Sequence, residues 1–280
     1  MHSDTDSAGQ VLGFYSRHPI SAAHILARLQ AVRGNLDGVT PQELFPHDQD
    51  HYGGLAANDA LATRAGLAAG QHVVDFCAGL GGPARYYAAH YGVTVTGIEI
   101  NPDRVSGAAR LTRLVGLQDS VTVLDGDVRH TRLSDACADV VLSQEALLHV
   151  PDRPAVFTEA ARLLRPGGRL AVTDWLAHRP LRAADTDSLW RGMAVRQQCD
   201  LATYRAQVER AGLRVLSVED LSAEWGPVLE ARFAMYRALR AETLAAGNPA
   251  GDDDFYASYA RLVALVQDGT LGGVRLAAVR

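Results

Sequence analysis

A glycine-rich turn that directly follows an apolar strand constrains this chain more than any other feature of its sequence. Residues 73–82 read Val-Val-Asp-Phe-Cys-Ala-Gly-Leu-Gly-Gly, and Glu99 closes a second apolar strand, 93–98. Glycine lets the backbone approach a ligand where a Cβ would clash, and the helix that follows directs its first N–H groups at an anionic group. A carboxylate after the second strand can accept both hydroxyls of a ribose. The glycine turn after the first strand and the carboxylate after the second together predict a site for a nucleoside-containing cofactor.

From residue 72 onward, short apolar runs alternate with segments of helical spacing, which is typical of a parallel α/β sheet covered by helices on both faces. We expect strands near 72–77, 93–98, 121–124, 139–143, 169–174, 213–218 and 272–279. We expect helices near 20–33, 55–67, 82–90, 102–115, 153–164, 202–211, 228–246 and 254–268, and a further short helix that begins at Pro41. Residues 1–53 are interpreted as an N-terminal helical extension that serves as a lid. Residues 54–280 then form the main domain, with helical insertions near 176–200 and 222–268.

Composition narrows the class of protein and its partners. The formal net charge is −5 with no long basic run, which argues against nucleic acid as a partner. No apolar stretch reaches membrane-spanning length and no signal pattern opens the chain, so a cytoplasmic protein is expected. Three scattered cysteines predict neither a disulfide framework nor a zinc site. The helical C-terminus suits either a lid or the interface of a homodimer.

The glycine turn alone leaves two cofactors open, because Gly79-x-Gly81-x-x-Ala84 also satisfies the dinucleotide fingerprint. The downstream chain decides between them. Gly126-Asp127 follows the third strand, where a carboxylate can accept the amine of an adenine. Residues 143–150, Ser-Gln-Glu-Ala-Leu-Leu-His-Val, follow the fourth strand, and Leu164-Arg-Pro-Gly-Gly168 precedes the fifth.

In this order, the motifs resemble those of the class I S-adenosylmethionine-dependent methyltransferases, from about residue 54 to 175. The resemblance is to the subgroup with the sarcosine, dimethylglycine, phosphoethanolamine and natural-product methyltransferases. Its first loop typically reads Asp-x-Gly-Cys-Gly-x-Gly-Gly-Pro-x-Arg-Tyr. Residues 75–86 read Asp-Phe-Cys-Ala-Gly-Leu-Gly-Gly-Pro-Ala-Arg-Tyr, so Cys77 stands where the family has its first glycine.

The resemblance implies a Rossmann-like, seven-stranded sheet whose last strand, 272–279, is antiparallel. It implies S-adenosylmethionine as donor, S-adenosylhomocysteine as product, and a small-molecule acceptor that offers a nitrogen, oxygen, carbon or sulfur atom. The implied cofactor-binding residues are Asp75, Cys77, Gly79, Gly81, Glu99, Ile100, Asp127, Val128 and Gln144. Three alternatives stay open: a cyclase or rearrangement enzyme on the same fold, a cofactor-binding subunit without activity, and a dinucleotide-dependent oxidoreductase.

Methyl transfer from a sulfonium requires alignment and, for some acceptors, removal of a proton. His149 is the candidate general base, and an orienting role for it is an equal alternative. Glu145 lies close to it in sequence and is expected to face solvent. Candidate substrate contacts are Tyr15, His51, Tyr52 and Trp175.

His47 and His51 are four residues apart and would share one face of a helix, where they could ligate a divalent metal. A polar lid segment is the favoured interpretation, and no metal site is predicted.

Overall fold

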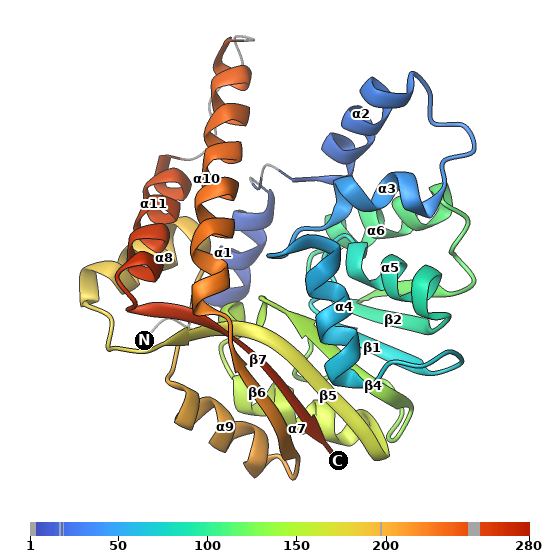
Figure 1. Ribbon diagram of the computed structural model, residues 1–280, viewed down its shortest axis with the longest axis vertical. Helices are drawn as coiled ribbons and strands as arrows, with labels where there is room; N and C mark the ends of the chain where they lie inside the picture. The colour runs from blue at the N-terminus through green and yellow to red at the C-terminus, as the bar shows by residue number, and fades with distance from the viewer. Residues whose placement is uncertain (1–3, 17, 19, 197, 246–252) are drawn as a thin grey trace.

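The chain folds around a single seven-stranded sheet with the order β3-β2-β1-β4-β5-β7-β6 (Figure 1). The computed structural model describes residues 4–16, 18, 20–196, 198–245 and 253–280. The strands are β1 (His72–Phe76), β2 (Thr94–Glu99), β3 (Val121–Asp125), β4 (Ala138–Gln144), β5 (Leu164–Ala177), β6 (Arg214–Asp220) and β7 (Leu271–Val279). The first five are parallel to one another, and β7 runs antiparallel to both β5 and β6. The expected fold class is confirmed.

Neighbouring apolar residues on the strands supply two separate cores, because successive side chains of a strand point to opposite faces. Val73 packs with helices α4 (Gly54–Ala65) and α5 (Gly82–Tyr91). Val74 packs with α7 (Arg153–Leu163) and α9 (Leu201–Arg210) on the other face. This continuous apolar sequence is the pattern expected for strands that are buried on both sides.

The loop after β1 packs closely against β2, at the position of Gly97 in that strand. A Cβ on Gly97 would lie 2.6 Å from the Cβ of Ala78, so a larger residue in β2 would push the loop outward. Helix α6 (Pro102–Leu114) starts just after β2, and the Asn101 side chain caps it by accepting the N–H groups of Asp103 and Arg104. These contacts fix the two loops that carry the predicted cofactor residues.

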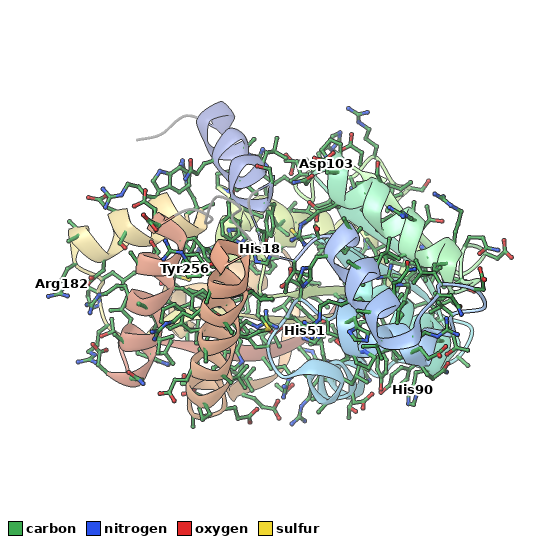
Figure 2. The ribbon with its side chains drawn as sticks, turned by 90° about the horizontal axis from the view of Figure 1, so that it is seen from above. His18, His51, His90, Asp103, Arg182 and Tyr256 are labelled. Carbon is green, nitrogen blue, oxygen red and sulfur yellow. The ribbon has the colours of Figure 1, made fainter. Side chains whose placement is uncertain are left out.

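Four helices distant in sequence form a cap beside the sheet. They are α1 (Asp4–Ser16), α8 (Ala183–Met193), α10 (Ser222–Ala245) and α11 (Asp253–Gln267), and they share an aromatic-rich core with Trp175 of β5. Helices α2 (Ala22–Arg33) and α3 (Pro41–Asp48) lie with α6 and α5 on the other side of the molecule in Figure 1. From above, His18 and His51 lie between these two groups of helices (Figure 2).

Several expected boundaries differ from the structure. Helix α1 was not expected, and α10 begins at Ser222 rather than near residue 228. The expected fifth strand, 169–174, begins earlier, at Leu164, and residues 165–168 interrupt its pairing as a bulge, since Ala138 pairs with Leu164 and Val140 already pairs with Arg169. Within the described residues, no helix is both long and apolar enough to cross a membrane.

Candidate functional site

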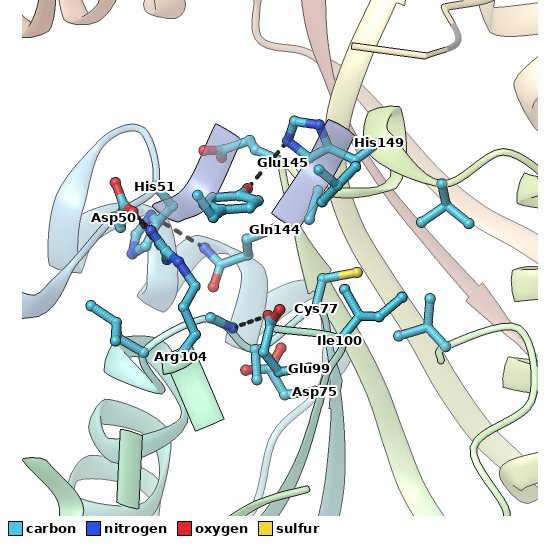
Figure 3. A pocket seen from close by; sticks show the side chains of 18 of the residues that line it. Asp50, His51, Asp75, Cys77, Glu99, Ile100, Arg104, Gln144, Glu145 and His149 are labelled. Carbon is cyan, nitrogen blue, oxygen red and sulfur yellow. Dashed lines mark hydrogen bonds and ion pairs between the residues drawn. The ribbon is translucent and has the colours of Figure 1, made fainter. Parts of the chain in front are cut away.

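A cavity opens at the carboxyl ends of β1, β2 and β4, where the loops after these strands converge (Figure 3). Its walls contain eight of the nine predicted cofactor residues: Asp75, Cys77, Gly79, Glu99, Ile100, Asp127, Val128 and Gln144. It also contains Tyr15, His51 and His149. A cleft at this edge of an open parallel sheet is the usual place for a nucleotide-like ligand.

Gly81 is the exception among the predicted residues. It precedes α5 with a φ of 74°, and a Cβ there would meet the Arg85 guanidinium at 3.1 Å and Ala108 at 3.5 Å. Gly81 therefore faces the protein interior, and its neighbours Gly82 and Pro83 line the cavity instead. The predicted turn is present, and the cofactor contact assigned to Gly81 stays a prediction for its backbone atoms.

The first loop has left-handed backbone at Gly81 and at two further positions. Gly79 has a φ of 56°, and Cys77 has a φ of 57° although it carries a side chain. This conformation costs a residue other than glycine about 1 kcal/mol or more. Cys77 thus adopts the backbone that the glycine of the family motif would adopt freely.

Glu99 anchors the two loops that border the cavity. Its carboxylate accepts the Gly79 N–H at 2.9 Å and the Asn101 N–H at 2.9 Å. Its side chain is buried, and burial raises its pKa while the Arg104 guanidinium opposes that rise. The Ile100 N–H also stabilises the ionised form, and a carboxylate with about four acceptor sites keeps capacity for a ligand.

Asp75 is a buried carboxylate, and no cationic side chain of the described residues lies beside it. Burial, reinforced by the negative charge of Glu99, raises its pKa to about 7. Among the described residues, Glu99 is the only charged side chain whose charge shifts this pKa. A buried acid in this state favours a cationic ligand.

At the other end of the cavity, Asp127 forms an ion pair with Arg129 at 2.8 Å. Partial burial of Asp127 raises its pKa, but hydrogen bonds from Arg129 outweigh that effect and hold the pKa of Asp127 below the ordinary value. Val128 is buried beside it, and Ile100 is 38% exposed toward the cavity mouth. The pair of apolar side chains next to a carboxylate suits a flat heterocycle with an amino group.

His149 is neutral, and its tautomer follows from its neighbours. Nδ1 lies 3.1 Å from the carbonyl oxygen of Ala194, which can only accept, so Nδ1 carries the proton. Nε2 therefore accepts, and the Tyr15 hydroxyl donates to it at 3.2 Å. Burial lowers the pKa of His149 to about 4. The Nε2 lone pair, which here accepts the hydrogen bond from Tyr15, gives the site a base.

His51 serves as a connector in a chain of hydrogen bonds. Its Nε2 lies 3.0 Å from Gln49 Oε1, and its Nδ1 lies 3.4 Å from Gln144 Nε2. Tyr87 donates to the oxygen of Gln144 at 3.0 Å, which orients that amide. Helix α3 ends at Asp48, so His47 and His51 do not share a helix face. Among the described residues, no three potential metal ligands gather at one point.

A second, smaller chamber of about 70 Å³ adjoins the cavity beneath the cap. It is lined mainly by aromatic side chains, including Phe14, Tyr15, Tyr52, Trp175, Tyr236, Phe255 and Tyr259. The predicted substrate contacts Tyr15, Tyr52 and Trp175 lie here, and His51 lies in the main cavity. His149 borders both spaces.

The expectation that Glu145 faces solvent is wrong. Glu145 borders both the cavity and the chamber, and its carboxylate accepts the Tyr52 N–H at 2.6 Å. Its backbone is left-handed, with a φ of 53°, which turns the side chain inward. Burial raises its pKa to about 7.

Comparison with known proteins shows which family has this type of cavity at the end of its sheet. Residues 74–172 match the family model described as a methyltransferase domain. The chain is 33% identical to methyltransferase GfsG of Streptomyces halstedii, over 72% of this chain and 75% of that protein. It is 34% identical to 27-O-demethylrifamycin SV methyltransferase of Amycolatopsis mediterranei, over 79% of this chain and 81% of the relative.

The chain belongs to the class I S-adenosylmethionine-dependent methyltransferases. It is an enzyme that uses S-adenosylmethionine to methylate a small molecule. A putative sarcosine dimethylglycine methyltransferase from Galdieria sulphuraria has the same fold, with a TM-score of 0.74, 21% identity, and coverage of 92% of this chain and 97% of that one.

Sequence reasoning missed three charged residues of this methyltransferase. Asp50 and Arg104 line the cavity, and Arg232 lines the chamber. Asp50 lies next to His51 in the segment interpreted as a polar lid, and no role was assigned to it. No local motif marks Arg232, which reaches Asp50 from a helix 182 residues further along the chain.

Proposed function

We propose that this methyltransferase transfers the methyl group to a hydroxyl oxygen of a hydrophobic small molecule, and that His149 receives the hydroxyl proton. The observation that carries this proposal is the lone pair of His149 Nε2, which borders the aromatic chamber and already accepts a hydroxyl hydrogen bond from Tyr15. An acceptor hydroxyl in place of the Tyr15 hydroxyl would donate to the same atom.

The residues around the cavity fit S-adenosylmethionine. The buried Asp75 carboxylate, beside which the described residues place no cation, suits the ammonium of the methionine part. Glu99 keeps lone pairs for the ribose hydroxyls while it fixes Gly79, and Asp127 with Val128 suits the adenine. When bound, the donor supplies a methyl group that its sulfonium has already activated, so no covalent nucleophile is required of the protein.

His149 then acts on the acceptor alone. With a pKa of about 4, it is unprotonated at neutral pH and takes up the proton as the new C–O bond makes the hydroxyl acidic. The carbonyl of Ala194 holds Nδ1–H and thereby points Nε2 at the chamber. Trp175, Tyr52 and their aromatic neighbours exclude water and offer an apolar surface.

The small size of the chamber supports a movement of the segments that cover it. A volume of about 70 Å³ holds only a few water molecules, so a larger acceptor enters when α1 and α10 separate. We therefore propose that the N-terminal segment 1–53 includes a lid, with α1 as the part that covers the acceptor.

The first acceptor to test is 27-O-demethylrifamycin SV, which the Amycolatopsis relative names as its substrate. Incubation with donor carrying a labelled methyl group should transfer the label to an alcohol oxygen, located by mass spectrometry and NMR. A panel of hydrophobic alcohols and the corresponding amines extends the test. Methylation of amines or carbon atoms alone, or conversion of an acceptor without a change in mass, would contradict the proposal.

The Asp75 carboxylate predicts a pH dependence of product binding. In the free protein Asp75 is half protonated near pH 7, and the ammonium of S-adenosylhomocysteine favours the ionised form. Affinity should therefore fall about tenfold as pH drops from 8 to 6, with proton uptake by the buffer on binding. Calorimetry in two buffers of different ionisation enthalpy measures both effects.

Two variants isolate the group responsible for this pH dependence. Asp75→Asn should bind weakly and with no slope between pH 6 and 8. Glu145→Gln removes the other cavity acid with a pKa near 7 and should keep the slope. A slope that disappears in Glu145→Gln and persists in Asp75→Asn would reject the assignment.

A further inference from the structure

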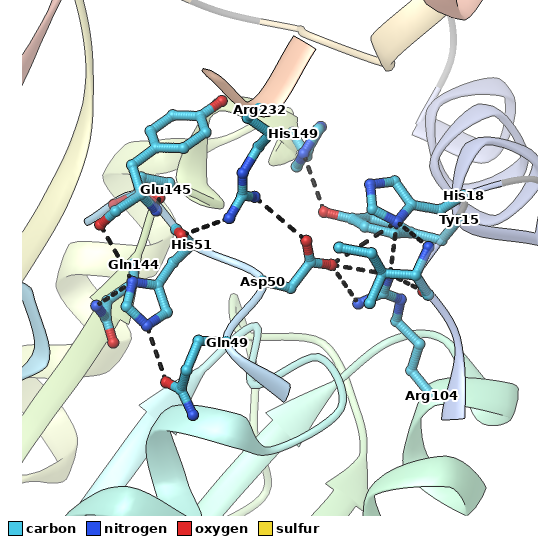
Figure 4. A network of polar contacts seen from close by, with 12 residues as sticks. Tyr15, His18, Gln49, Asp50, His51, Arg104, Gln144, Glu145, His149 and Arg232 are labelled. Carbon is cyan, nitrogen blue, oxygen red and sulfur yellow. Dashed lines mark hydrogen bonds and ion pairs between the residues drawn. The ribbon is translucent and has the colours of Figure 1, made fainter. Parts of the chain in front are cut away.

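One carboxylate connects four separate segments of the chain at the boundary between the donor cavity and the acceptor chamber. Asp50, on the loop between α3 and α4, lines both spaces. Arg104 of α6 donates to its Oδ2 at 3.3 Å, and Arg232 of α10 donates to its Oδ1 at 3.4 Å. His18, which follows α1, lies 3.8 Å from Oδ2. Figure 4 shows these side chains converging on Asp50.

The first arginine belongs to the donor side. Arg104 lines the donor cavity, and its guanidinium would lie 3.2 Å from a Cβ on Gly79. The same guanidinium stacks on the ring of Tyr15 at 4.2 Å, and Tyr15 in turn bonds His149. Arg104 is therefore in contact with both the cofactor loop and the N-terminal helix.

The second arginine belongs to the acceptor side only. Arg232 lines the chamber and is absent from the lining of the donor cavity. Besides Asp50, it donates to the carbonyl oxygen of His51 at 2.7 Å and lies over the ring of Tyr52 at 5.3 Å. Its side chain is 15% exposed and that of Asp50 is 18% exposed, so water screens their attraction only weakly.

We infer that Asp50 is a positioning residue that couples retention of the donor to closure of the acceptor chamber, by holding α10 and the segment after α1 against the donor loop through Arg232, Arg104 and His18. Each contact of Asp50 with Arg104, Arg232 and His18 is long for a hydrogen bond. Because all three meet on one carboxylate, loss of one contact weakens the others, and the closed arrangement is cooperative. The inference rests on the donor placement proposed above. The inference predicts that a substitution of Arg232 in the chamber changes the release rate of S-adenosylhomocysteine, although Arg232 does not line the donor cavity.

The test is the release rate of S-adenosylhomocysteine, measured by stopped-flow displacement on the intact protein. Asp50→Asn and Arg232→Gln should each speed release about tenfold, because removing one partner of a partly buried charge pair acts mainly on dissociation. The association rate should change little. The double variant should release the product no faster than about twice the rate of Asp50→Asn, because both substitutions break the same Asp50–Arg232 contact.

The matched control is Arg237→Gln on the same helix, an exposed arginine that lies over Phe233 at 5.8 Å and should release product at the wild-type rate. Arg232→Met keeps the apolar stem and tests the same contact if the glutamine variant does not fold. Wild-type release from either Arg232 variant, or multiplicative rates in the double variant, would overturn the inference. If Glu99→Ala speeds release and the Arg232 variants do not, the coupling fails while the donor placement stands.

Discussion

Replacing His149 with alanine is expected to lower kcat by about 10²- to 10⁴-fold, the range that loss of a positioned general base produces. The expectation follows from the neutral imidazole, whose Nε2 lone pair borders the chamber while Nδ1 is held by the Ala194 carbonyl. The affinity for S-adenosylhomocysteine should stay within about twofold of wild type, because the acids assigned to the donor are untouched. Steady-state kinetics with an alcohol acceptor and calorimetry with the product measure the two effects.

Two further observations separate a base from an orienting residue. Added imidazole should restore part of the activity of His149→Ala, because the deleted ring leaves space at the border of the cavity. The kcat of the wild type should show no titration near pH 6.5, since burial lowers the pKa of His149 to about 4. A variant that raises KM while kcat stays at the wild-type value would assign His149 to positioning and remove the base from the mechanism.

The second large effect concerns the donor. Glu99→Ala should weaken S-adenosylhomocysteine binding about 100-fold, because two charge-assisted hydrogen bonds at about 1.5 kcal/mol each are lost and each 1.4 kcal/mol is tenfold in affinity. The loop also loses the acceptor of the Gly79 N–H, which adds to the loss. Calorimetry at pH 8, where Asp75 is ionised, measures the change.

Glu99→Gln keeps the size of the side chain and one oxygen, so its affinity should lie between those of wild type and Glu99→Ala. Asp125→Ala removes an exposed acid at the end of β3 and should leave affinity unchanged. Equal affinity of Glu99→Ala and wild type would mean that the ribose lies elsewhere.

The sheet and the first loop were predictable from the sequence because they depend on local pattern. Consecutive valines such as Val73 and Val74 mark a strand buried on both faces, and the glycine turn after it has a backbone geometry that few residues tolerate. The turn also placed Asp75, Cys77 and Gly79 at the cavity. Which side of the turn Gly81 faces depends on its packing against Arg85 and Ala108, which no short motif records.

The acceptor side was less predictable, because its residues meet through tertiary contacts. Helix α1 begins with four polar residues, Asp-Thr-Asp-Ser, and its Val11 and Phe14 are buried against the other helices of the cap. Glu145 turns inward through an uncommon left-handed backbone that its neighbours in sequence do not indicate. Asp50 and Arg232 lie far apart along the chain, so neither charge alone suggested a contact.

The most direct test of the account is a crystal structure of the protein with S-adenosylhomocysteine. We expect the ribose hydroxyls to lie within hydrogen-bond distance of Glu99, the amino group beside Asp75, and the sulfur on the side of the cavity that His149 borders. A product molecule bound away from these two acids, or with its sulfur directed away from the chamber, would contradict it.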